Sequence, residues 1–123
     1  MLNKIHKQIH NKLVKQRKTI SVAESCTGGL LSCLLTDIAG SSKYFLLGIV
    51  AYSDKSKETI LNIPVKTIAK YGAVSGKVAI LMAKNIRKKI NSDLGLSITG
   101  IAGPAGATVN KPVGTVFICL SYK

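Results

Sequence analysis

The stretch GSSKYFLLGIVAYSDKSK, residues 40–57, decides the fold. It opens with a Gly-Ser-Ser turn, and residues 44–52 then form an almost wholly apolar run rich in aromatic and β-branched residues. Such a run between polar turns predicts a strand that is buried on both faces. After it, Ser53 or Asp54 can cap a short helix that carries lysines.

Two chemical interpretations of this stretch stay open. The hydroxyls of Ser41 and Ser42 precede the strand and the lysines of residues 53–57 follow it, so they meet only if the segment bends back or a loop folds over it. A serine beside a desolvated lysine is a nucleophile–base pair, because burial lowers the lysine pKa and frees its lone pair. The alternative is a surface turn followed by a solvated helix start.

The rest of the chain alternates apolar strands with helices. Further strands are predicted at residues 19–23, 94–101 and 115–120. Helices are predicted at residues 2–15, 30–38, 55–61 and 65–71, and from a cap at Ser75 onward. This alternation predicts an α/β layered domain, in which helices cover a mixed sheet of about four to five strands.

Ligands of such sheets bind beyond the strand ends, so we expect the connecting loops to share one cleft. The candidate loops are residues 24–29, the Ser41-Ser42 turn and residues 99–106.

The loop ESCTGG, residues 24–29, joins a predicted strand to a predicted helix. Such a turn can present backbone N–H groups to an anion, with Thr27 as the helix cap and Gly28 and Gly29 admitting a phosphate closely. The alternative is a tight turn that needs glycine for packing. Glu24 can accept a hydrogen bond from an amide or hydroxyl of a ligand, or pair with a neighbouring lysine.

Composition limits the class of function. The 123 residues, 46% of them hydrophobic, suffice for one domain with a packed core. Eighteen basic side chains against five acidic ones give a net charge of +13, which favours an anionic partner: nucleic acid, a lipid surface or a phosphorylated small molecule. The basic helix at residues 2–15 can touch such a surface or pack its apolar stripe on the domain.

The cysteines and the apolar runs bear on metal binding and location. Three widely spaced cysteines without a Cys-x-x-Cys pair predict no zinc site, and free thiols in a reducing compartment. No apolar run reaches bilayer length, and the N-terminus lacks a signal-peptide core. We therefore expect a cytoplasmic protein without a membrane partner.

Six segments in register resemble the C-terminal domain of the competence/damage-inducible protein CinA. They are AESCTGG (23–29), DIAGSSKYF (37–45), VAYSDKSK (50–57), YGAVS (71–75), TGIAGPAG (99–106) and KPVGTV (111–116). Proteins consisting of that domain alone are nicotinamide-mononucleotide deamidases. The resemblance implies hydrolysis of nicotinamide mononucleotide to nicotinate mononucleotide and ammonia, with no metal and no organic cofactor.

The resemblance also implies roles for single residues. The serine of the GSS turn, Ser42, is the implied nucleophile and Lys57 its base, with Tyr52 as the nearby tyrosine and Thr99 shaping the substrate site. A neutral Lys57 can take the Ser42 proton and pass it to departing ammonia, which requires its pKa to fall from roughly 10.4.

Our own inference adds binding groups to these implied roles. Backbone N–H groups of the Gly-rich loops, which include Gly100 and Gly103, can stabilise the oxyanion. Basic side chains and the helix start at residues 27–29 can hold the phosphate.

Family members continue past the KPVGTV strand through another strand, a Gly-Asp-Arg motif and a closing helix. We therefore expect residues 1–123 to be a single domain, truncated at the C-terminus, without the family's functional arginine. We also expect an exposed sheet edge or apolar face.

Three functions stay open. The first is the deamidase, which we expect to act on a phosphorylated pyridine riboside and to form a homo-oligomer. The second is a catalytically impaired remnant or split-gene fragment that binds a nucleotide or a protein partner. The third is a nucleic-acid-binding module; the chain has four Tyr and two Phe and no groove-reading motif, so we expect no specific nucleic-acid partner.

Overall fold

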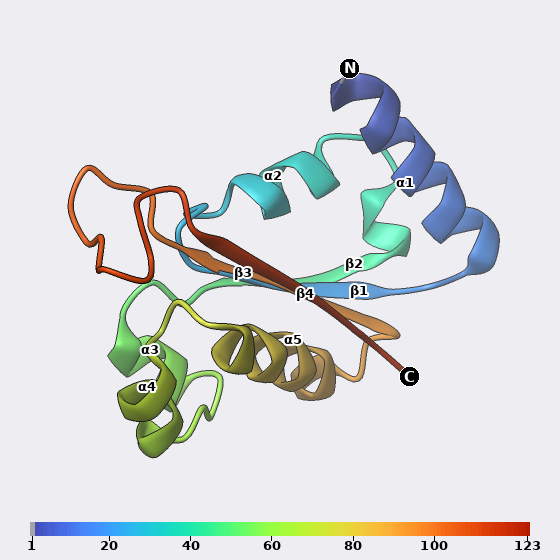
Figure 1. The fold of residues 1–123 in the computed structure, drawn as a ribbon. Helices are drawn as coiled ribbons and strands as arrows, with labels where there is room; N and C mark the ends of the chain where they lie inside the picture. Colours follow the sequence, from blue (N-terminus) through green and yellow to red (C-terminus); the bar gives the residue numbers. More distant parts are fainter. Residues whose placement is uncertain (1) are drawn as a thin grey trace.

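A computed structural model describes residues 2–123 and shows a four-stranded mixed sheet between two layers of helices (Figure 1). The strands are β1 (Ile20–Glu24), β2 (Phe45–Val50), β3 (Leu94–Gly100) and β4 (Val116–Tyr122). The helices are α1 (Leu2–Gln16), α2 (Leu30–Thr36), the 3-10 turn η1 (Ser41–Lys43), α3 (Asp54–Thr59), α4 (Val65–Tyr71) and α5 (Gly76–Ile90). The predicted α/β layered class is confirmed.

The strand order is β2-β1-β3-β4, with β1 parallel to both of its neighbours and β4 antiparallel to β3. All five residues of β1 are buried, because it has a strand on each side and helices on each face. In β2 half-buried and exposed residues alternate. The prediction of a strand buried on both faces was therefore wrong for β2, which lies at an edge of the sheet.

Helices α1 and α2 cover one face of the sheet, and α3, α4 and α5 lie on the other (Figure 1). One apolar cluster forms under α1 and α2 from Leu13, Ile20, Val22, Leu35 and Tyr44. The second forms against α4 and α5 from Ala23, Ala51, Leu61, Ile63, Ile68, Val78, Met82 and Ile86. The apolar stripe of α1 packs on the domain only near its C-terminal end, since Leu13 is buried while Ile5 and Ile9 are exposed.

The local signals at the ends of α3, α4 and α5 are confirmed. Ser53 and Ser75 cap α3 and α5, and each side chain accepts a hydrogen bond from a backbone N–H in the first turn. Gly72 ends α4 with a φ of 79°, a backbone conformation that glycine adopts without strain.

Strand β4 forms the other edge of the sheet. The side chains on one face of β4 are apolar and exposed: Val116, Ile118, Leu120 and Tyr122. The expected exposed apolar face is therefore present on β4. No helix within residues 2–123 combines the length and apolarity needed to cross a bilayer.

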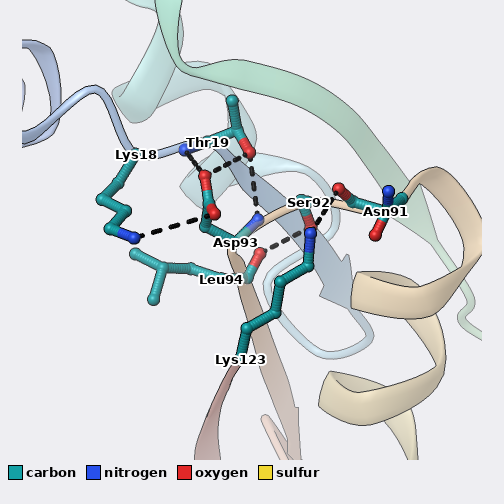
Figure 2. A network of polar contacts seen from close by, with 7 residues as sticks. All are labelled: Lys18, Thr19, Asn91, Ser92, Asp93, Leu94 and Lys123. Atoms are coloured by element: carbon teal, nitrogen blue, oxygen red, sulfur yellow. Dashed lines mark hydrogen bonds and ion pairs between the residues drawn. The ribbon is translucent and has the colours of Figure 1, made fainter.

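The amino end of β1 is fixed by a polar network around Asp93 (Figure 2). The Asp93 carboxylate accepts the Thr19 N–H at 2.8 Å and the Thr19 hydroxyl at 3.0 Å, and Lys18 lies 3.8 Å away. Lys123 donates to the Asn91 carbonyl at 3.2 Å. The network joins the starts of β1 and β3 to the end of β4.

Candidate active site

A cavity of about 320 Å³ lies at the carboxyl ends of β1 and β3. Ser25 follows β1 directly, and its N–H donates to the Ile98 carbonyl of β3 at 3.0 Å. Tyr52 and Lys57 follow β2, whose carboxyl end lies at the same edge because β1 and β2 are parallel. The sheet topology therefore brings three separate segments to one site.

The Lys57 ammonium lies inside this site, with the residue only 1% exposed. Its Nζ donates to Ser25 Oγ at 3.1 Å and to the Tyr52 carbonyl at 3.0 Å. The one ion pair within residues 2–123 joins Lys18 to Asp93, so no carboxylate lies within 4.0 Å of Lys57 there. Burial lowers the pKa of Lys57 against the opposing influence of Asp54 and Cys26.

Ser42 is not part of this site. It lies in η1, before β2, whereas Lys57 follows β2. The six residues of β2 run straight between them and span about 20 Å. The predicted contact between Ser42 and Lys57 was therefore wrong, because no bend returns the GSS turn to the other end of the strand. The hydroxyl that Lys57 reaches belongs to Ser25.

Glu24 is fully buried and faces the start of α2 rather than the cavity. Its carboxylate accepts the hydroxyls of Thr27 and Ser32 at 2.7 and 2.6 Å, and the N–H groups of Leu31 and Ser32 at 2.8 and 3.0 Å. Burial raises the pKa of Glu24, but these hydrogen bonds outweigh burial and the net pKa is lowered. The prediction that Glu24 accepts a ligand hydrogen bond is corrected, because its oxygens are already satisfied within the protein.

The same contacts show that the prediction of a phosphate site at the start of α2 was wrong. Helix α2 begins after Gly29, without a side-chain cap from that residue, and the Thr27 hydroxyl turns to Glu24. The Glu24 carboxylate therefore occupies the place where an anion would meet the first turn of the helix. Gly28 and Gly29 serve the turn with φ of 58° and 102°, and neither they nor Thr27 line the cavity.

The end of β3 and the loop after it line the cavity, as expected. Thr99, Gly100 and Gly103 border it together with Lys57 and Tyr52. The Thr99 hydroxyl donates to the Ala73 carbonyl at 2.9 Å, which ties this wall to the loop between α4 and α5. A Cβ on Gly100 would lie only 2.8 Å from the Thr115 carbonyl oxygen, so the close packing there requires glycine.

Two other side chains complete the surroundings of Lys57. Tyr52 is 68% exposed at the mouth of the cavity, and Asp54 also lines it. Cys26 borders the cavity as an unpaired thiol, as Cys33 and Cys119 are elsewhere. Within residues 2–123, no three His, Cys, Asp or Glu side chains are grouped as metal ligands.

Ser25 is the residue that the sequence interpretation missed. Its signal is its place in ESCTGG, where a buried strand turns sharply into a helix and presents a hydroxyl at the sheet end. The sheet topology points to the same residue. Because β1 and β2 are parallel, their carboxyl ends meet at one edge, and the residue after β1 comes close to the residues after β2. The resemblance had instead implied Ser42, the serine of the GSS turn.

Comparisons with known proteins agree with this fold. The family model of the CinA C-terminal domain matches residues 2–123. A CinA-like protein of Geotalea daltonii is 51% identical over 107 residues, which are 87% of this chain and 26% of that protein. A competence-damage inducible protein of Thermoanaerobacter pseudethanolicus is 55% identical over 106 residues, again 26% of its length. The chain thus spans about a quarter of these relatives.

Solved structures match more of their own length. The competence/damage inducible protein CihA of Agrobacterium tumefaciens superposes with a TM-score of 0.96 at 34% identity, over 99% of this chain and 74% of that one. A CinA superfamily protein of Escherichia coli gives a TM-score of 0.95 at 31% identity, over 100% and 72% of the two chains.

Proposed function

The chain belongs to the CinA C-terminal domain family, and from that premise we propose that it is an amidohydrolase with a Ser25–Lys57 dyad. The proposed reaction converts nicotinamide mononucleotide to nicotinate mononucleotide and ammonia. The observation that carries the proposal is the 3.1 Å contact between Lys57 Nζ and Ser25 Oγ, inside a cavity, with a lysine that is buried and has a lowered pKa. A buried amine without an acid partner is costly to a fold, and catalysis explains its presence.

The first step is attack by Ser25. A neutral Lys57 keeps one N–H for the Tyr52 carbonyl and offers its lone pair to the Ser25 proton. Ser25 Oγ then bonds to the amide carbon of the substrate while its proton moves to Lys57. Such general base catalysis is favoured when the pKa of the base lies near the working pH, which the burial of Lys57 promotes.

The tetrahedral intermediate needs donors for its oxyanion. Within residues 2–123, the backbone N–H groups of Cys26 and Gly103 donate no hydrogen bond, and both residues border the cavity. We assign them to the oxyanion. Lys57 next returns the proton to the leaving nitrogen, so ammonia departs and an acyl-serine forms. Water then attacks the acyl carbon as Lys57 takes its proton, and Lys57 passes that proton to Ser25 Oγ as the acyl–oxygen bond breaks, which releases the carboxylate product and restores the dyad.

Tyr52 and Thr99 complete the proposed site. The exposed Tyr52 ring at the cavity mouth offers a flat apolar surface to the pyridine ring. The Thr99 hydroxyl fixes the opposite wall through Ala73. A phosphorylated pyridine riboside is thus the proposed small-molecule partner, whereas homo-oligomerisation and a cytoplasmic location stay predictions.

The test is release of ammonia from nicotinamide mononucleotide by the purified chain. We expect turnover that is lost in Ser25→Ala and retained in Ser42→Ala, which removes the same hydroxyl group from the other end of β2. Loss in Ser42→Ala with activity in Ser25→Ala would reject the dyad. Binding of the mononucleotide without any turnover would instead support the alternative of a catalytically impaired binder.

A further inference from the structure

We propose that Lys70, Lys77 and Lys111, which cluster around Tyr71 beside the cavity, bind the phosphate monoester of the substrate. The proposal rests on the proposed function for the identity of the ligand, a pyridine mononucleotide. It adds a separate subsite in place of the phosphate site that Glu24 excludes at the start of α2.

Three cations from different parts of the chain converge on Tyr71. The ammonium groups of Lys70 and Lys77 lie 5.2 and 5.9 Å from the centre of its ring. Lys111, in the loop before β4, donates to the Tyr71 carbonyl at 2.8 Å. The neighbouring Gly72 allows this approach, since a Cβ there would lie 3.3 Å from Lys111 Nζ.

No acid neutralises this cluster within residues 2–123, where the single ion pair is that of Lys18 with Asp93. The partners of the three lysines are an aromatic ring and a carbonyl, and a cation–π contact at an exposed site is worth only about 0.5–1 kcal/mol. Three like charges around one residue repel one another. A bound phosphate would relieve this repulsion and accept charge-assisted hydrogen bonds from the ammonium groups.

The cluster is linked to the active-site cavity by the chain that follows Tyr71. Tyr71 is two residues from Ala73, which lines the cavity and accepts the Thr99 hydroxyl. Two residues of chain span at most about 7 Å, so the backbone of Tyr71, which Lys111 contacts, lies near the cavity rim. The cavity lining itself contains one basic side chain, Lys57, and the proposed chemistry uses that amine. A phosphate on the substrate therefore finds its cations at this rim.

The test compares two ligands that differ only by the phosphate, nicotinamide mononucleotide and nicotinamide riboside. Calorimetric titrations at low salt use the full chain with Ser25→Ala, which prevents turnover. We expect the mononucleotide to bind more tightly than the riboside. Lys77→Gln and Lys111→Gln should each weaken mononucleotide binding roughly threefold and leave riboside binding unchanged.

Lys84→Gln is the matched control, because it removes the same charge from the same helix, α5, about 10 Å along its axis from Lys77. Lys77→Gln also separates loss of charge from loss of structure, because it leaves in place the hydrogen bond from Lys111 to the Tyr71 carbonyl. Equal binding of the two ligands, no binding of either, or equal weakening by Lys84→Gln and Lys77→Gln would overturn the proposal.

The outcome is separable from that of the proposed function. Failure to release ammonia rejects the hydrolase, but a difference between mononucleotide and riboside would still support the phosphate site. Conversely, ammonia release with an unchanged KM in both Lys77→Gln and Lys111→Gln would reject the phosphate site alone.

Discussion

At one end of the sheet the surroundings favour the charged form of an ionisable side chain, and at the other end they favour the neutral form. At the amino end of β1, Asp93 accepts two hydrogen bonds from Thr19 and has Lys18 nearby (Figure 2). These contacts, first of all the Thr19 N–H, lower the pKa of Asp93 and so favour its charged form. At the carboxyl end, burial lowers the pKa of Lys57 and so favours its neutral form.

This contrast separates stabilising polar groups from reactive ones. Asp93 joins strand ends, and its charge is compensated. Lys57 is buried beside a hydroxyl and a carbonyl, neither of which carries a compensating charge. A fold gains from the first arrangement and loses from the second, so the second indicates a role outside stability.

The largest expected effect is that of Lys57→Met. Loss of the base should lower the rate of ammonia release on the order of a thousandfold. The same change should raise the free energy of unfolding by about 1 kcal/mol at neutral pH, because it removes a buried amine. Lys55→Met, on the same helix and exposed, is the control for both measurements.

The sign of the stability change has a pH dependence that can be checked. The folded pKa of Lys57 lies below its unfolded value, so between the two the unfolded chain binds more protons and wild-type stability rises with pH. The stability gain of Lys57→Met should therefore shrink as pH approaches about 10.4. A gain that is constant across this window would show that folding does not lower the pKa of Lys57.

Glu24→Ala should have the next largest effect, on stability. It leaves four donors at the start of α2 without their acceptor, and we expect a loss of about 3 kcal/mol in urea unfolding. Glu24→Gln keeps the shape but not the charge, and should cost about half as much. Wild-type stability in Glu24→Ala would contradict the assigned role.

Asp93→Asn should cost about 1–2 kcal/mol in unfolding and leave ammonia release unchanged. The folded pKa of Asp93 is lowered, so its contribution is present above the unfolded value and is lost as pH falls through the folded value. The difference from wild type should therefore disappear in acid. Reduced activity in Asp93→Asn would mean that the two ends of the sheet are coupled.

The smallest expected effect is that of Asp54→Asn on the pH profile of kcat/KM. Activity should rise with pH as Lys57 loses its proton, and the Asp54 charge raises the pKa of Lys57. Its removal should shift the rising limb to lower pH. Glu58→Gln, on the same helix, is the matched control, and equal shifts in the two variants would show only a general effect of charge.

Local signals in the sequence predicted most of the elements. Ser75 and Gly72 mark helix ends by their own side-chain and backbone preferences, and the structure confirms both. The burial of β2 was mispredicted because it depends on the strand order β2-β1-β3-β4, which arises from contacts far along the chain. An apolar composition alone does not distinguish an edge strand from a central one.

The candidate site shows the same limit. Lys57, Tyr52, Thr99, Gly100 and Gly103 were placed at one cavity from their motifs. The serine was misassigned because the resemblance implied the GSS turn, whereas the hydroxyl that Lys57 contacts belongs to Ser25, 32 residues away along the chain. The sequence likewise did not determine which way the Glu24 side chain points. Side chains alternate between the two faces of a strand, and only the position of α2 decides which face offers hydrogen-bond donors.

The central place of β1 also affects when a growing polypeptide becomes competent to react. The backbone N–H of Ser25 is held by the Ile98 carbonyl, on a strand that a ribosome produces only after some seventy further residues. A nascent chain that ends before this strand has the serine and the lysine but lacks the backbone that orients them. Hydrolytic capacity should therefore emerge late in synthesis, and an interrupted translation product should be inert.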